Sequence, residues 1–149
     1  MTRGGSLRIF PPPVANLELV DGYLDVEGFH NIGLTTEELV SVGVPNPREG
    51  GSWRLGSPEK GAWAAYFLRD SRTEAIESYD TNQQVGGEVR LTRFDPKRHL
   101  AEGTFQFDAP LHRRVGPRHL PDTLHIRNGK FRARYRIIPA HAYSRPHRD

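Results

Sequence analysis

The feature that most constrains the fold is strict alternation of apolar and polar residues in the second half of the chain. In Gly103–Ala109 (GTFQFDA) every second residue is apolar or small, and Leu124–Tyr135 (LHIRNGKFRARY) repeats this period. Successive side chains of a β-strand point to opposite faces of a sheet, so this alternation indicates half-buried strands. We therefore expect Phe105, Phe107 and Phe131 to face a core.

Two dipeptides predict where strands reverse or bend. Asp21-Gly22 separates two short apolar runs and is typical of a two-residue hairpin. The register of that hairpin places Leu19 opposite Leu24, Leu17 opposite Val26 and Glu18 opposite Asp25; the last pair is a contact between like charges. Asn128-Gly129 supplies the positive-φ residues that a tight turn or a bulge requires.

Short apolar runs bounded by turn residues continue through the rest of the chain. Thr35–Glu38 has the Thr-x-x-Glu form of a capping box and predicts one helical turn, and Pro110–Pro121 is expected to form a long basic loop. About eight to ten strands at regular spacing predict an all-β, single-domain antiparallel sandwich or barrel with little helix. The further strands are expected at Leu39–Val44, Ser52–Leu55, Ala62–Leu68, Glu74–Asp80 and Glu88–Phe94.

The chain of 149 residues suits one domain. Pro11-Pro12-Pro13 cannot join a central strand, so residues 1–14 are expected to form an extended arm or linker, residues 15–138 the β domain and residues 139–149 a flexible tail. No apolar run approaches the ~20 residues of a membrane helix. No signal peptide is visible, so the expected location is extracytoplasmic if such a segment has been removed and cytoplasmic otherwise.

Charge divides unevenly along the chain. Residues 1–86 carry 7 basic and 12 acidic side chains (net −5), and residues 87–149 carry 14 and 6 (net +8). Clustered basic side chains attract anionic partners, although the same stripe can be a solvated face of the sheet. The outward positions of the last strand are the candidates for binding an anionic partner: Arg127, Lys130, Arg132, Arg134 and Arg136.

Signs of catalysis are few. The chain has no cysteine, no Gly-x-Ser-x-Gly motif and no phosphate-binding glycine loop before a helix, so we expect no enzyme activity and no cofactor. His119, Asp122 and His125 fall within seven residues and are of the types that bind zinc or non-haem metals. However, His125 alternates with inward residues and should face outward, away from a loop-borne His119.

The C-terminal third resembles a family of uncharacterised secreted bacterial lipoprotein domains. The similar residues form the block G-T-F-x-F-x-A followed by I-x-N-G-x-F-x-x-x-Y, here Gly103–Ala109 and Ile126–Tyr135, preceded by Gly87, Thr92 and Asp95. This chain has Arg132 where the family often has an acidic residue, and it lacks the lipid-modified cysteine. The resemblance implies an extracytoplasmic β domain and supplies no catalytic or binding residue.

Three functions remain open from the sequence. The first is a non-catalytic cell-envelope β domain that binds an anionic surface component or another envelope protein. Nucleic acid is disfavoured as a partner because the alternation separates most aromatic residues from the arginines. The second is a barrel that carries a small apolar ligand. The third is a metal-assisted hydrolase around His119, Asp122 and His125. The oligomeric state does not follow from the sequence.

Overall fold

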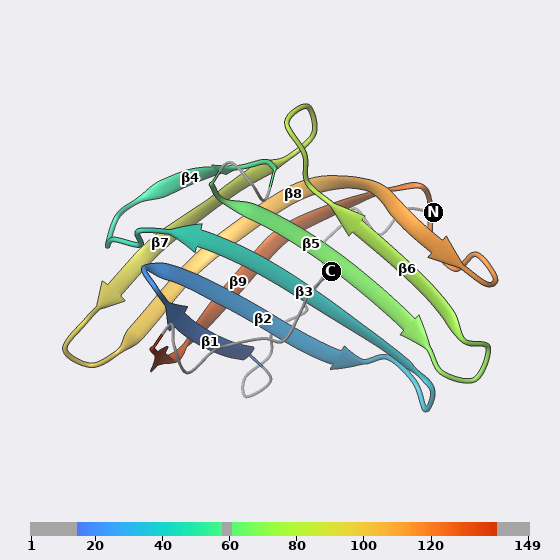
Figure 1. Cartoon of the computed structure of the whole chain (residues 1–149), viewed down its shortest axis with the longest axis horizontal. Helices are drawn as coiled ribbons and strands as arrows, with labels where there is room; N and C mark the ends of the chain where they lie inside the picture. The colour runs from blue at the N-terminus through green and yellow to red at the C-terminus, as the bar shows by residue number, and fades with distance from the viewer. Residues whose placement is uncertain (1–14, 58–60, 140–149) are drawn as a thin grey trace.

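A computed structural model describes residues 15–57 and 61–139, and it places nine β-strands and no helix within them (Figure 1). The predicted arm, 1–14, and residues 140–149 of the predicted tail lie outside the described residues. No described segment forms a helix of the length and apolarity that crossing a membrane would require. The strands are β1 (Ala15–Val20), β2 (Tyr23–Asn31), β3 (Thr36–Pro45), β4 (Ser52–Leu55), β5 (Trp63–Asp70), β6 (Ala75–Asp80), β7 (Gly87–Asp95), β8 (Leu100–Val115) and β9 (Thr123–Ile138).

The hairpin of β1 and β2 confirms the predicted register. Leu17 pairs with Val26 and Leu19 with Leu24, so both strands present their leucine and valine side chains to the same face. Asp21 and Gly22 have φ values of 52° and 78°, the left-handed conformation that a tight hairpin requires at both central positions.

Seven strands form a hydrogen-bonded ring in the order β1, β2, β3, β5, β6, β8 and β9, and β9 closes the ring by pairing with β1. In Figure 1, β2, β3, β5 and β6 slope in one direction, and β7, β8 and β9 cross them. The closing pair is parallel, with Leu17 beside Tyr135 and Val20 beside Ile138. The all-β fold is therefore as predicted, but its sheet is mixed rather than wholly antiparallel.

Strand β8 organises the sheet because it pairs along both edges. One edge pairs with β9; on the other, Leu100–Phe107 pairs with β7 and Leu111–Val115 with β6. Strands β6 and β7 thus lie end to end along β8, and β4 pairs with the outer edge of β7. The basic loop predicted at Pro110–Pro121 is mostly wrong, because β8 continues through Pro110 to Val115.

The local geometry explains how a proline fits into this long strand. The N–H of Leu111 donates to the carbonyl of Asp122, beside β9, so the nitrogen of Pro110 faces the opposite edge of β8. On that edge the pairing with β7 ends at Phe107 and the pairing with β6 begins at Leu111. Pro110 occupies this break, where its missing N–H costs no ladder hydrogen bond.

The helical turn predicted at Thr35–Glu38 is also wrong. Strand β3 begins at Thr36, and Glu38 is a strand residue that pairs with His30 and is 1% exposed. Asn128-Gly129 forms a bulge inside β9 rather than a turn between two strands. Phe105 pairs with Gly129 and Phe107 with Ile126, and Asn128 has a φ of 59°.

The inward faces of the strands meet in one apolar core. The alternation predicted for Phe105, Phe107 and Phe131 is confirmed, because all three are buried. The alternation fails near the end of β9, where Ile137 is 54% exposed. The largest apolar or aromatic side chains that are fully buried are Leu17, Leu24, Leu55, Tyr66, Tyr79, Leu91, Phe107, Leu124, Ile126 and Phe131.

Candidate functional site

Two of the five predicted basic residues are engaged within the chain. Arg127 donates from Nη2 to Asp108 Oδ1 at 2.8 Å and from Nη1 to the carbonyls of Phe107 and Ile126 at 3.3 and 3.0 Å. Arg136 binds Glu18 across the parallel pair of β9 and β1. This cation compensates for the like-charge contact of Glu18 with Asp25, and both arginines support the fold.

The other three predicted residues, Lys130, Arg132 and Arg134, remain exposed on the outer face of β9. Arg132 Nε lies 3.9 Å from Glu102 Oε1, a long and solvent-screened pair. Lys130 and Arg134 form no ion pair with any residue that the structure describes. These side chains are therefore available to an external anion.

Arg90 of β7 belongs with them, although the alternation along β9 does not identify it. The register aligns Arg90 with Thr104 of β8, and Thr104 with Lys130 of β9, so all three exposed side chains occupy one row across three strands. Outward alternation in β7 is visible in the sequence, but the register that brings Arg90 to Lys130 is not. We call Arg90, Lys130, Arg132 and Arg134 the basic face.

The surface of the basic face is hollowed in two adjoining places. A hollow of about 280 Å³ is lined by Glu88, Arg90, Thr104, Phe105, Gln106, Asn128, Gly129 and Lys130. A second of about 590 Å³ shares Thr104 and Lys130 and extends to Thr92, Glu102, Gly103, Phe131 and Arg132. The bulge residues Asn128 and Gly129 line the 280 Å³ hollow. Bulged strands bend and twist more strongly than regular ones, which favours a concave surface at this point. The basic face therefore combines positive charge with concave surface.

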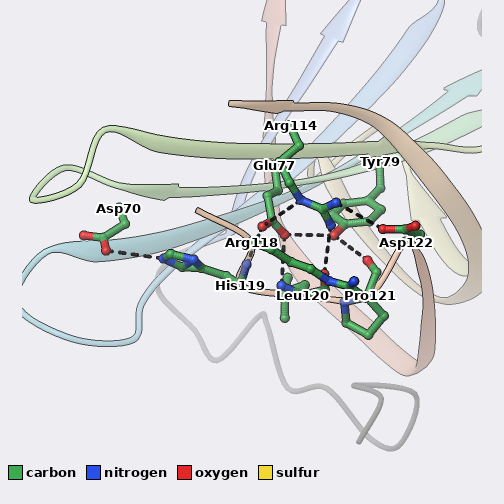
Figure 2. Close-up of polar contacts among 9 residues, drawn as sticks. All are labelled: Asp70, Glu77, Tyr79, Arg114, Arg118, His119, Leu120, Pro121 and Asp122. Atoms are coloured by element: carbon green, nitrogen blue, oxygen red, sulfur yellow. Dashed lines mark hydrogen bonds and ion pairs between the residues drawn. The ribbon is translucent and has the colours of Figure 1, made fainter. Parts of the chain in front are cut away.

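A second polar site lies at one end of the ring of strands, around the loop between β8 and β9 (Figure 2). Glu77 of β6 is fully buried and accepts hydrogen bonds from the backbone N–H of His119 at 2.5 Å and of Leu120 at 3.1 Å. Arg114 of β8 donates to Glu77 Oε2 at 3.2 Å. The Tyr79 hydroxyl lies 2.9 Å from Glu77 Oε1. We call these residues the end cluster.

The charges of Glu77 and Arg114 in the end cluster are compensated by hydrogen bonds and ion pairs with neighbouring groups of the chain. Arg114 also donates to Asp122 Oδ1 at 3.1 Å and to the carbonyl of Leu120 at 2.9 Å. Burial, together with the neighbouring Glu77 carboxylate, raises the pKa of Tyr79 above its ordinary value, so the protonated hydroxyl is favoured further. This arrangement fixes the loop against β6 at the end of the ring of strands.

The predicted metal residues do not converge. His119 Nε2 lies 3.4 Å from Asp70 Oδ2, whereas Asp122 binds Arg114 (Figure 2). His125 faces outward, as predicted, and its Nδ1 lies 2.8 Å from Asp108 Oδ1. Among residues 15–57 and 61–139, no three histidine or acidic side chains are grouped to hold a metal ion.

Asp108 of β8 contacts both His125 and Arg127 of β9. Its partial burial would raise the carboxyl pKa, but hydrogen bonds from His125 and Arg127 outweigh this effect and lower the pKa of Asp108. Asp108 is thus held as a carboxylate that bridges β8 and β9.

A further buried carboxylate, Glu38, is not predicted by the sequence patterns. Glu38 of β3 accepts a hydrogen bond from the Tyr66 hydroxyl, and its Oε2 lies 3.1 Å from His30 Nδ1. The signal was present, since Glu38 precedes the alternating valines of β3, but the capping-box interpretation assigned it to a helix. Its partners are residues of β5 and β2, so the site depends on strand order.

Comparison with protein-family models, with curated proteins and with solved structures gave no match to this chain. The resemblance to secreted lipoprotein domains therefore stays a prediction from the C-terminal residues.

Proposed function

We propose that this chain is a non-catalytic binding domain that holds an anionic partner on its basic face. The observation that carries the proposal is the row of Arg90, Thr104 and Lys130 across three strands, with concave surface on and beside it. Exposed cations at such a surface attract anions. Lys130 has no ion pair to break among the described residues, and the pairs of Arg90 with Glu88 and of Arg132 with Glu102 are long and exposed to solvent. A location in the cell envelope is part of the proposal and rests on the sequence resemblance.

The two other functions have weaker support. An apolar-ligand carrier needs interior space, and the inward positions of this barrel include Tyr66, Tyr79 and Phe107, each no more than 1% exposed. A metal-assisted hydrolase needs His119, Asp122 and His125 together, and each has a different partner. The basic face is the candidate that combines exposure, charge and shape.

The double variant Lys130→Gln and Arg132→Gln tests the proposal. We expect its affinity for a sulfated polysaccharide to fall about tenfold or more at low salt, because each removed charge-assisted contact contributes about 1 kcal/mol. Affinity is measured by calorimetry and by the salt concentration that elutes each protein from a sulfated-polymer column.

The matched control is Lys97→Gln with Arg113→Gln, which removes the same two charges from exposed positions outside the basic face. It should retain nearly the parent affinity. If both double variants lose affinity equally, the binding reflects net charge alone and the proposed face is incorrect.

A further inference from the structure

We infer that Arg90, Thr104 and Lys130 form a socket for one tetrahedral oxyanion, a sulfate or phosphate ester carried by a sugar. This inference rests on the proposed function and specifies its ligand. We call the three residues the oxyanion socket.

The geometry of the oxyanion socket follows from the register of the sheet. Thr104 is the partner of Arg90 on one side and of Lys130 on the other. Neighbouring strands lie about 4.8 Å apart, so the Cα atoms of the two cationic residues are separated by about 10 Å. Two long side chains on either side of a short one can converge over it, which leaves the threonine hydroxyl to donate from below.

Arg90 has one acidic neighbour and remains largely exposed. Glu88 lies two residues before Arg90 on the same face, and its Oε2 is 3.7 Å from Arg90 Nη2. The same carboxylate oxygen accepts a hydrogen bond from Ser52 of β4 at 2.6 Å. The Arg90 side chain is still 59% exposed, so its guanidinium can bind an external oxyanion.

The remaining lining favours a sugar as the carrier of the oxyanion. Glu88, Gln106 and Asn128 line the same hollow and offer acceptors and amide donors to hydroxyl groups. A nucleic acid would place further phosphates near Glu88 and would need aromatic surfaces for its bases. The one aromatic residue among the lining residues, Phe105, is 3% exposed and cannot serve as a stacking platform. Positive charge at one point, with two amide side chains and one carboxylate around it, therefore matches a monosulfated or monophosphorylated sugar unit whose hydroxyl groups bind these side chains.

The test is a titration of the full chain with four probes, monitored by calorimetry and by the NMR chemical shifts of the backbone amides. The probes are inorganic sulfate, inorganic phosphate, a sulfated oligosaccharide and a phosphorylated oligosaccharide. We expect saturable binding of at least one oligosaccharide, with the largest shifts at the amides of Arg90, Thr104 and Lys130. Whichever of the two oligosaccharides binds more tightly shows whether the oxyanion socket prefers a sulfate or a phosphate ester.

The decisive variant is Thr104→Val, which removes one hydroxyl and changes neither charge nor shape appreciably. We expect it to weaken the better oligosaccharide about tenfold or more, because a hydrogen bond to a charged group is lost. The control Thr123→Val makes the same change at an exposed position at the start of β9 and should bind as the parent does. Circular dichroism establishes that both variants fold.

The outcomes separate this inference from the proposed function. Unchanged affinity in Thr104→Val overturns the socket, whereas the basic face stands if Lys130→Gln with Arg132→Gln still weakens binding. No loss in that double variant overturns both. Tighter binding of single-stranded DNA than of either oligosaccharide at equal salt overturns the assignment to a sugar.

Discussion

At the scale of single residues, Gly129 shows how closely the bulge of β9 is packed. A Cβ atom built at this position would lie 2.4 Å from two ring atoms of Phe105, whose side chain is buried in the core. The glycine lets β9 approach the ring beneath the bulge, at the edge of the 280 Å³ hollow.

We therefore predict that Gly129→Ala lowers the free energy of unfolding by about 1–3 kcal/mol, the usual cost of overpacking a core. Gly33→Ala is the control, because a Cβ atom at Gly33 would have no heavy atom within 4 Å. Chemical denaturation followed by tryptophan fluorescence measures both. Equal stability of the two variants would contradict the close contact.

The basic residues show how far sequence alone could reach at this scale. Their outward direction on β9 followed from alternation and is confirmed by the exposure of Lys130, Arg132 and Arg134. Which of them are free to bind an external anion could not be predicted from alternation. Arg127 pairs with a residue 19 positions away and Arg136 with one 118 positions away. Such partners depend on strand order, which alternation does not encode.

At the scale of elements, Glu77 attaches the loop between β8 and β9 to β6. Two backbone N–H groups and Arg114 converge on this buried carboxylate, whereas Asp122, which binds the same arginine, has a side chain that is 70% exposed. The same cation thus has one buried and one solvated partner.

We predict that Glu77→Gln destabilises the fold by about 3–5 kcal/mol, because it leaves a partly buried arginine and buried backbone donors without their carboxylate. Asp122→Asn should cost less than about 1 kcal/mol, since exposed ion pairs contribute little. Denaturation measures the difference, and hydrogen exchange at the amides of His119 and Leu120 should accelerate only in Glu77→Gln. Similar costs for the two substitutions would contradict the inferred role of Glu77.

Most of the strands could be placed from their patterns, as the bounds of β4 and the hairpin of β1 and β2 show. The failures at Thr35–Glu38 and Pro110 have one physical cause. Capping and proline rules describe an isolated segment, whereas β3 gains its stability from β2 and β5, and Pro110 lies in a break between β6 and β7. Tertiary pairing outweighed local preference at both positions.

At the scale of the whole molecule, acid is expected to weaken the fold through its bonded carboxylates. The pKa of Asp70 is lowered by hydrogen bonds from Thr35, Arg72 and Thr73, and that of Asp108 by His125 and Arg127 against the effect of burial. A carboxyl whose folded pKa is lowered stabilises the protein above its unfolded pKa of about 3.9 and loses that contribution as the pH falls through the folded value.

We predict that Asp108→Asn is less stable than the parent at pH 7 and that this difference shrinks as the pH falls below about 4. The midpoint of thermal unfolding measured from pH 7 to pH 2 checks this. Asp21→Asn, which removes one exposed carboxylate from the first hairpin turn, is the matched charge control. A difference for Asp108→Asn that stays constant over this range would contradict the role of the Asp108 carboxylate.

The parallel pairing of β1 with β9 also determines when this protein can fold during its synthesis. The first described strand borders the last, so the ring stays open until residues 135–138 have left the ribosome. Until then β2 is the only described strand beside β1, and the edge that will meet β9 lacks that strand as its partner. Unpaired strand edges on a nascent chain invite association with other chains. Completing the hydrogen-bonded ring therefore depends on the arrival of β9.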